Sequence, residues 1–344
     1  MLLERLKNDG RPELKLNSLQ KKTKKLVSQK VNTGTYKFEN INCPVCENNR
    51  ATIIGEKDRY GLSYITNICS SCGLVYTNPR MNEASYAEFY NQEYRKLYVG
   101  KESPTIDFFE SQRRKGKRIF SFLLSNKLIS KNKLHVLEVG CGAGGILHFF
   151  RSKGHAVEGL DLGAEYVKYG VEDHGLPLTV GSLESLSLSY KPDLIIYSHV
   201  MEHILDLNKE LQLLKKISHQ NTVIYIEVPG IKYVHKNFRS NILRYFQNAH
   251  TFHFSLESLK NILTKNGFEL VVGNQTIESA FKINDHNYSI KNDYNEVKDY
   301  LFYVEKNRPY YKFTAQGMKE NLRSALDWGL RFTKLKWITR KISS

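Results

Sequence analysis

Long apolar runs, a secretory leader and internal repeats are all missing from this sequence of 344 residues. A membrane-spanning helix needs roughly 20 consecutive apolar residues, and no run approaches that length. The first residues, MLLER, lack the apolar stretch and cleavage site of a secretory signal, so we expect a cytoplasmic location. Hydrophobic residues still make up 41% of the chain, which is enough to bury a sizeable core and argues against disorder except at the ends.

Acidic residues are scarce. The chain has 35 Asp and Glu against 51 Lys and Arg, for a net charge of +16. Such a field favours anionic partners, whether nucleotides, nucleic acid, anionic lipid or phosphorylated substrates. Part of the excess lies at the two ends, where a solvated tail is the simpler interpretation. Near the C-terminus, apolar residues recur at helical spacing between lysines and arginines: Trp328, Phe332, Leu335, Ile338 and Ile342. This pattern predicts either a peripheral membrane contact or a helix packed on the protein itself.

Cysteine is also rare, but four of the five cysteines form two Cys-x-x-Cys pairs. The pairs Cys43/Cys46 and Cys69/Cys72 are separated by 22 residues. Two such pairs in a cytosolic chain indicate a tetrahedral Zn²⁺ site rather than disulfides. Because four thiolates leave no open position on the metal, we predict a structural zinc. Free or redox-active thiols are the alternative.

The pattern of the chain divides it into five parts. We predict a basic, partly mobile arm (1–40), a zinc-binding knuckle domain (41–80), a helical connector (81–130), an α/β domain (131–284) and a mostly helical extension with a basic tail (285–344). In the α/β domain six strand-like runs alternate with helical stretches, which favours a parallel sheet with helices on both faces. The runs are 135–139, 156–160, 178–180, 193–197, 223–228 and 268–272.

A glycine loop, Glu138–Gly145, follows the first of these strands and opens a helix. With Gly145 as its third glycine the loop fits the dinucleotide pattern, and with Gly144 it fits the methyltransferase pattern. A carboxylate at Glu138 suits a cofactor that carries an ammonium and a sulfonium better than it suits a pyrophosphate. Asp161 ends the second strand, 19 residues after Gly142, where an acid can bind both ribose hydroxyls. A glycine-rich turn without a ligand is the remaining alternative.

These segments resemble class I S-adenosylmethionine-dependent methyltransferases. Val136–Gly144 is similar to their first motif, Gly159–Leu162 to their second, His199–His203 to their segment after the fourth strand and Ile226–Pro229 to their fifth strand. The resemblance spans roughly residues 134 to 275. It implies a Rossmann-like α/β fold with a seven-stranded, mostly parallel sheet. It also implies cofactor contacts from Glu138, Gly140, Gly142, Gly144, Asp161, Leu162, Ser182, Leu183 and His199.

One position in this stretch departs from the family pattern. Ser182 stands where many relatives have an acid that faces the adenine, so we predict that the backbone of Leu183 replaces that contact. Cys141 lies inside the glycine loop, and we expect it to pack there rather than to act as a nucleophile.

A cysteine knuckle before such a domain resembles a subset of the family, the sugar-modifying methyltransferases of antibiotic and surface-polysaccharide pathways. The segment Cys72–Arg80 is similar to theirs, and Asn248–Ser255 resembles the segment that carries their catalytic histidine. That histidine falls on His250. Ala249 and Gln247 stand where those carbon methyltransferases have a glutamate and a tyrosine. The departure favours methylation of oxygen over carbon on a nucleotide- or lipid-linked sugar.

We therefore predict His250 as the general base, with His203 and Glu202 as further catalytic candidates. The alternative for His250 is a packing histidine beside the next helix, and for the other two a role in shaping the loop beside the cofactor. An RNA methyltransferase would also suit the positive charge and the knuckle, although the Asn/Asp-Pro-Pro-aromatic motif of base-amino methyltransferases is absent. A non-catalytic module that keeps the cofactor fold is a second alternative.

Overall fold

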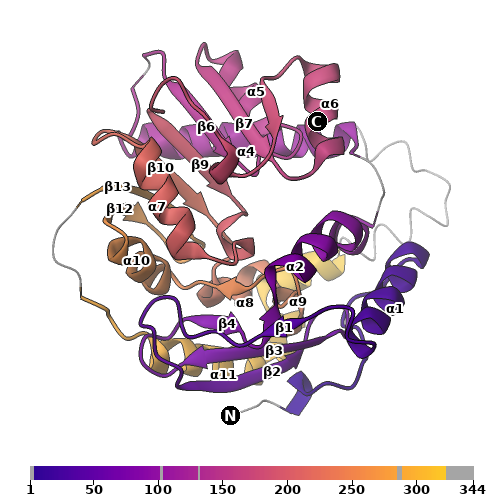
Figure 1. Cartoon of the computed structure of the whole chain (residues 1–344). Helices are drawn as coiled ribbons and strands as arrows, with labels where there is room; N and C mark the ends of the chain where they lie inside the picture. Colours follow the sequence, from indigo (N-terminus) through magenta and orange to yellow (C-terminus); the bar gives the residue numbers. More distant parts are fainter. Residues whose placement is uncertain (1–3, 101–103, 131, 285–288, 323–344) are drawn as a thin grey trace.

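The computed structural model describes residues 4–100, 104–130, 132–284 and 289–322. These residues form two lobes, each built on one sheet (Figure 1). One lobe holds a seven-stranded sheet of order β12-β13-β10-β9-β6-β7-β8, and the other a four-stranded sheet of order β11-β4-β3-β2. We call them the seven-stranded and the four-stranded lobe.

The seven-stranded lobe has the α/β fold that the sequence predicts. Its strands are β6 (His135–Val139), β7 (Ala156–Asp161), β8 (Leu178–Val180), β9 (Leu194–Ser198), β10 (Val223–Glu227), β12 (Phe268–Gly273) and β13 (Glu278–Ile283). The five from β6 to β10 run parallel, and β13 pairs antiparallel with both β10 and β12. All six runs expected from the pattern are strands. The Rossmann-like, seven-stranded, mostly parallel fold is confirmed.

Helices cover both faces of this sheet. On one face lie α4 (Ile106–Ser125), α5 (Gly145–Ser152) and α6 (Ala164–His174), and on the other α7 (Leu207–Ile217) and α10 (Leu256–Lys265). Alternate strand residues supply the two cores: Val136 packs in the cluster with α4 and α5, whereas Leu137 packs in the cluster with α7 and α10. Because both faces are covered, the central strands read as continuous apolar runs.

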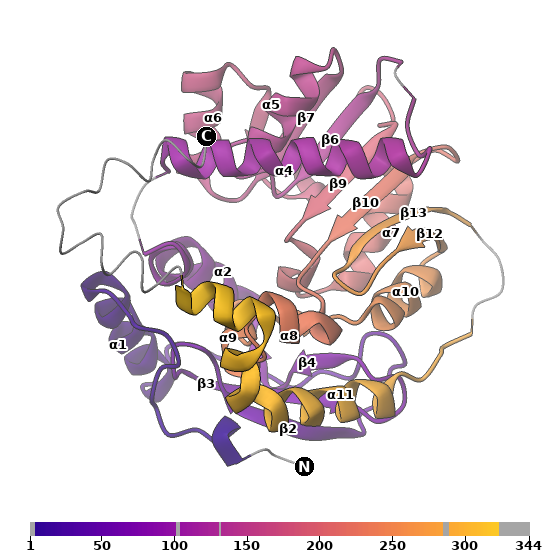
Figure 2. The ribbon, with the colours of Figure 1, turned by 180° about the vertical axis from the view of Figure 1, so that it is seen from behind.

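Helix α4 lies along the back of the sheet (Figure 2). It begins at the N-cap Thr105, whose side chain accepts a hydrogen bond from the backbone of Phe108. Gly116 lets α4 approach α5 closely, since a Cβ there would lie 2.9 Å from the carbonyl oxygen of Ile146. Half of the predicted connector thus belongs to the seven-stranded lobe.

The four-stranded lobe is assembled from distant parts of the chain. Strands β2 (Ala51–Lys57), β3 (Ser63–Cys69) and β4 (Val75–Thr77) come from the predicted knuckle, whereas β11 (Phe252–His253) comes from the segment between β10 and α10. Phe252 pairs with Tyr76 in an antiparallel ladder. Three helices complete the lobe: α8 (Val234–Asn237), α9 (Ile242–Tyr245) and α11 (Tyr294–Asn307). The knuckle is therefore not a domain of its own.

The N-terminal region differs from the predicted arm. Helix α1 (Ser18–Asn32) begins with a capping box between Asn17 and Gln20 and buries Val27. Tyr36 is buried behind it, and Lys30 and Tyr36 both bond to the carboxylate of Glu93. These contacts pack the region against the helices α2 (Glu83–Phe89) and α3 (Arg95–Tyr98). The lysine-rich composition gave no indication of this packing. Strand β1 (Phe38–Glu39) also pairs with β5 (Arg80–Met81), which ties the N-terminal region to the segment before α2.

Among the described residues no helix combines the length and apolar character needed to cross a bilayer. The C-terminal extension continues after α11 as a 3₁₀ segment, Arg308–Phe313. The amphipathic pattern from Trp328 to Ile342 lies outside the described residues.

Candidate active site

The glycine loop has the backbone that its three glycines predict. Gly140, Gly142 and Gly144 adopt φ values of +70°, +56° and +77°, a region that other residues rarely occupy. A Cβ on Gly144 would come within 2.7 Å of Leu176, and one on Gly140 would collide with Val200. The loop can therefore turn tightly between β6 and α5 and expose its backbone.

Asp161 closes the loop from the end of β7. Its carboxylate accepts hydrogen bonds from the backbone N–H of Gly142 at 2.8 Å and of Gly163 at 2.7 Å. The guanidinium of Arg95 lies 3.7 Å away. Gln112 of α4 supports the loop from below, donating to the carbonyl of Cys141 at 3.0 Å. Asp161 is thus fixed beside the glycines, as a ribose-binding carboxylate would need to be.

Glu138 is the most unusual group at this site. Its side chain is 1% exposed, and its Oε2 atom has no hydrogen-bond partner among the described residues. Burial, together with the nearby charge of Asp161, raises the pKa of Glu138 well above its ordinary value. A buried carboxylate oxygen without a partner is costly unless a cation or donor reaches it. The ammonium and sulfonium of S-adenosylmethionine fit this need.

Three further predicted cofactor residues line the ends of neighbouring strands. Leu162 follows Asp161 and its side chain is 54% exposed, which leaves it available to a ligand. Ser182 is exposed after β8, and its N–H donates to Ser185 at 3.2 Å. Leu183 is buried, so its backbone rather than its side chain is the group that could face an adenine.

His199 follows β9 with a φ of +60°, a strained conformation that often marks functional residues. Its Nδ1 lies 3.5 Å from Glu202 and its Nε2 3.3 Å from Glu227. Burial lowers the pKa of His199, but hydrogen bonds to the two carboxylates raise it more, so the net shift is upward. Arg118 also pairs with Glu227, at 2.6 Å.

The three catalytic candidates come together at the seam between the lobes, and we call them the Glu–His–His cluster: Glu202, His203 and His250. The Nε2 of His250 lies 3.9 Å from Glu202 Oε1, and the two imidazole rings meet edge to face at 4.7 Å between centroids. Thr251 fixes this arrangement, because its N–H donates to the carbonyl of Glu202 at 2.8 Å.

Burial shapes the chemistry of both imidazoles. It lowers the pKa of His203 and lowers that of His250 further below its ordinary value, with neighbouring histidines adding to the effect. A neutral imidazole of low pKa is a weak proton acceptor, although its nitrogen lone pair stays available to an acid or a cation.

The sequence analysis missed the aromatic helix that covers the cluster. Tyr90 and Tyr94 stack on each other with centroids 4.6 Å apart, and both meet the ring of His203 edge to face. They lie in a π-helical turn, Tyr90–Tyr94, a rare form found often at functional sites. The neighbouring residue, Arg95, places its guanidinium over the ring of Tyr166, 4.1 Å from the ring centroid. The signal was present as tyrosines spaced four apart in the connector.

The four paired cysteines form one compact group. Sγ of Cys43 lies 3.4 Å from that of Cys72, and the same distance separates Cys46 and Cys69. All four sulfurs lie within 4.8 Å of one another, which fits a tetrahedral metal site. The fifth cysteine, Cys141, is buried in the glycine loop, and burial holds the pKa of its thiol well above the ordinary value.

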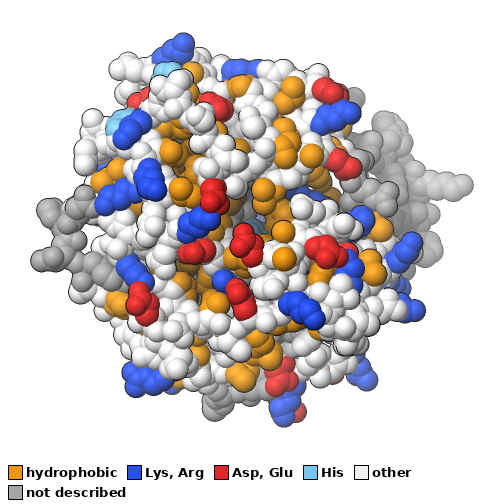
Figure 3. Space-filling model, in the orientation of Figure 1, with side chains coloured by type: hydrophobic (Ala, Val, Ile, Leu, Met, Phe, Trp, Pro, Cys, Tyr) orange, Lys and Arg blue, Asp and Glu red, His pale blue; other side chains and the backbone are white. Residues whose placement is uncertain are grey.

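A cavity of about 400 Å³ lies in the four-stranded lobe, between α1 and the sheet. Its lining includes Val27, Tyr64, Arg80, Tyr86 and Thr251, with no acidic residue among the described ones. Tyr64 and Thr77, which line the cavity, donate hydrogen bonds to the backbone carbonyl of His250. The imidazole of His250 points the other way, toward Glu202. The loop that carries His250 therefore separates the cavity from the Glu–His–His cluster. Charged and apolar side chains mix across the middle of the face seen in Figure 3, where the lobes meet.

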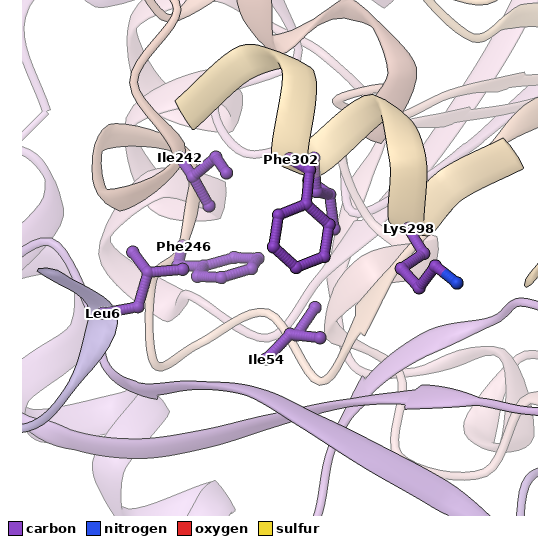
Figure 4. A pocket seen from close by; sticks show the side chains of 7 residues that line it. Leu6, Ile54, Ile242, Phe246, Lys298 and Phe302 are labelled. Carbon is purple, nitrogen blue, oxygen red and sulfur yellow. The ribbon is translucent and has the colours of Figure 1, made fainter. Parts of the chain in front are cut away.

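A second, apolar void lies between α9, α11 and β2 (Figure 4). At about 10 Å³ it barely admits one water molecule and offers that molecule no ring of polar partners. It is a packing gap in the core of the four-stranded lobe.

Residues 109–272 match a family model described as a methyltransferase domain. Most of the matched stretch lies in the seven-stranded lobe, whose strand order is that of the Rossmann-like methyltransferase fold. Over 115 residues, 33% of this chain, the sequence is 31% identical to malonyl-[acyl-carrier protein] O-methyltransferase of Pectobacterium atrosepticum. The match covers 44% of that relative, so the chain spans less than half of its length.

Two solved structures align with part of this chain. A SAM-dependent methyltransferase from Archaeoglobus fulgidus is 21% identical with a TM-score of 0.40, covering 62% of this chain and 91% of that one. Magnesium protoporphyrin IX methyltransferase from Synechocystis, solved with bound SAH, is 14% identical with a TM-score of 0.41, covering 59% of this chain and 100% of that one.

Proposed function

We propose that this protein is an S-adenosylmethionine-dependent methyltransferase. The single observation that carries the proposal is the buried carboxylate of Glu138, whose Oε2 atom has no hydrogen-bond partner among the described residues, at the start of a three-glycine loop, with Asp161 fixed beside it. When bound, the cofactor supplies a methyl group on a positively charged sulfur. Glu138 would neutralise that charge, Asp161 would hold the ribose, and the glycines would let the backbone approach.

We propose oxygen as the atom that receives the methyl group. A hydroxyl must lose its proton as its oxygen takes the methyl, so the site needs a group that accepts or displaces that proton. The Glu–His–His cluster lies after β9, on the same edge of the sheet as the glycine loop. Ala249 beside His250 leaves the cluster without the adjacent glutamate that the sugar carbon methyltransferases use. The relative from Pectobacterium is by its name also an O-methyltransferase.

We propose a hydroxylated sugar on a nucleotide or lipid carrier as the acceptor. The net charge of +16 favours an anionic carrier. The cavity has no acidic residue among the described residues of its lining, and the guanidinium of Arg80 in its wall is paired with Glu39, so its wall does not repel such a carrier. The four cysteines would hold one structural Zn²⁺ and with it the sheet that frames this cavity.

A methyl-transfer screen with labelled S-adenosylmethionine tests the proposal. Nucleotide sugars, lipid-linked sugars and total RNA are offered in parallel, and each product is digested to locate the label. Labelled sugar hydroxyls are the expected result. Labelled RNA would show that the acceptor is nucleic acid, a class that the net charge of +16 also favours. A protein that shows no calorimetric binding of the cofactor would be a non-catalytic module, contrary to the proposal.

A further inference from the structure

The Glu–His–His cluster contains a buried carboxylate, Glu202, whose nearest polar partner is the imidazole of His199 at 3.5 Å. Glu202 is 2% exposed, and neither of its oxygens accepts a hydrogen bond of normal geometry from the described residues. His199 lies 3.5 Å away, but that imidazole also faces Glu227. A carboxylate so buried is stable only beside a positive charge or several donors. Because Glu202 and Glu227 share the single imidazole of His199, the position of Glu202 favours a further cation.

One ring nitrogen of each imidazole lies within 4.8 Å of the other and of an oxygen of Glu202. Nδ1 of His203 lies 3.0 Å from the carbonyl oxygen of Ala249, so that nitrogen carries the proton and Nε2 keeps the lone pair. A ring N–H bonded to a backbone carbonyl is the usual support of a metal-binding histidine. At His250 the side-chain amide of Gln247 contacts Nε2: with its nitrogen toward the ring the amide donates and Nε2 keeps the lone pair, and with its oxygen toward the ring the amide accepts.

We propose that Glu202, His203 and His250 bind a divalent transition-metal ion, separate from the four-cysteine site. Their ligand atoms all lie within 4.8 Å of one another. Two imidazoles and one carboxylate are the donor set of open divalent sites in proteins, and three ligands leave positions for a substrate oxygen. The contact from Gln247 to His250 is the one that the ion displaces.

The inference rests on the proposed function, because the ion lies beside the proposed cofactor site and acts on the same acceptor. A bound cation lowers the pKa of the hydroxyl that binds it. The hydroxyl proton then leaves to water. The new O–CH₃ bond forms as the S–CH₃ bond breaks, and its electron pair stays on sulfur. His250 serves this reaction as a ligand, which a neutral imidazole does well.

Cobalt provides the test. The zinc-loaded protein is treated with a mild chelator, so that the four thiolates keep Zn²⁺, and is then titrated with Co²⁺ while the visible spectrum is recorded. One equivalent of Co²⁺ should bind with the weak bands of nitrogen and oxygen ligands and without thiolate charge-transfer bands. Glu202→Gln keeps the shape of the side chain and removes its charge. It should weaken binding by more than a hundredfold, since loss of a mere supporting residue costs ten- to a hundredfold.

His219→Gln is the matched control, because His219 is a partly exposed histidine near Asp193, remote from the cluster. It should bind Co²⁺ like the wild type, and circular dichroism should show that all variants fold. A folded wild type that takes up no Co²⁺ beyond its zinc, or Glu202→Gln with unchanged affinity, would overturn the inference. Calorimetry with S-adenosylmethionine on the same samples separates the two proposals: cofactor binding without Co²⁺ refutes only the metal site, and Co²⁺ binding without the cofactor refutes only the methyltransferase.

Discussion

The two lobes differ in how the chain builds them. The seven-stranded lobe comes from one stretch, residues 104–284, interrupted only between β10 and α10. The four-stranded lobe takes β2–β4 from the first quarter of the chain, β11 from the interruption and α11 from the far end. The first lobe is held by local βα units, whereas the second is held by contacts between distant segments.

This difference locates the chemistry. The glycine loop and Asp161 belong to the seven-stranded lobe, and His250 arrives with the interruption that joins the other sheet. The hydrogen bond from Thr251 to Glu202 crosses the seam and brings the two sets together. Cofactor binding should therefore depend on one lobe, and turnover on both.

Removal of the metal from the four cysteines should have the largest effect. Structural zinc contributes about 10 kcal/mol or more to folding in small zinc domains. Cys72→Ser should lose one zinc equivalent in metal analysis and lower the free energy of unfolding by several kcal/mol, with a smaller effect on cofactor affinity. Cys141→Ser changes the one cysteine that is not part of the four-cysteine site, so this variant should keep its zinc. A metal-free wild type that stays fully folded would contradict the assignment.

Loss of the imidazole of His250 should slow turnover strongly while the cofactor still binds. His250→Ala should slow methyl transfer by about 10² to 10⁴, whether the ring binds a proton or a cation. Steady-state kinetics and calorimetry measure the two effects separately. His203→Ala should disturb cofactor binding as well, because Tyr94 and Arg95 connect it to Asp161.

The control for this pair is His235→Ala, at a half-buried histidine of α8 that bonds to Tyr300. It should turn over normally. If His250→Ala turned over the true acceptor as fast as His235→Ala does, the group that handles the proton would have to be another residue.

A buried acid in the four-stranded lobe should make that lobe sensitive to pH. Asp58 accepts hydrogen bonds from the backbone of Tyr60, Leu62 and Asn248, yet burial raises its pKa from 3.8 to about 6. Because the folded protein holds this proton more tightly than the unfolded chain, stability falls as pH rises from about 4 to 6. The fall should be about 3 kcal/mol relative to Asp58→Asn, at about 1.4 kcal/mol per pH unit.

Urea unfolding of both proteins at pH 4, 5, 6 and 7 measures this difference. Parallel profiles for wild type and Asp58→Asn would show that the backbone donors compensate the buried charge and that the pKa is not raised.

The smallest expected effect concerns the cofactor in the seven-stranded lobe. Asp161→Ala should weaken S-adenosylmethionine binding by at least about 1.4 kcal/mol, a factor of ten, if the carboxylate holds both ribose hydroxyls. Isothermal calorimetry measures it, with Glu165→Gln on the exposed side of α6 as the control. Equal affinity in the two variants would remove Asp161 from the cofactor site.

The sequence predicted the seven-stranded lobe well because its signals are local. Strand and helix periods, the glycines and Asp161 all lie within short stretches, so their register could be read directly. The four-stranded lobe was not predictable in the same way. Nothing near Phe252 shows that it pairs with Tyr76, and nothing near Val297 shows that it packs on the knuckle sheet.

The candidate site divides along the same line. Glu138 and Asp161 could be assigned from the loop motif alone. That Glu202 and His250 meet, with 47 residues between them, follows only from the ladder of β11 and the bond at Thr251. The cover of Tyr90, Tyr94 and Arg95 likewise depends on how the two lobes face each other.

The two-residue strand β11 also limits how freely this architecture can be recombined. If the N-terminal third were grafted onto another methyltransferase domain, its sheet would lack β11, which pairs with β4. The new domain would also lack His250, which β11 positions. Changes of acceptor should therefore require residues 229–255 to travel together with residues 41–98. The protein is better regarded as one interlaced unit than as a catalytic module with an attachment.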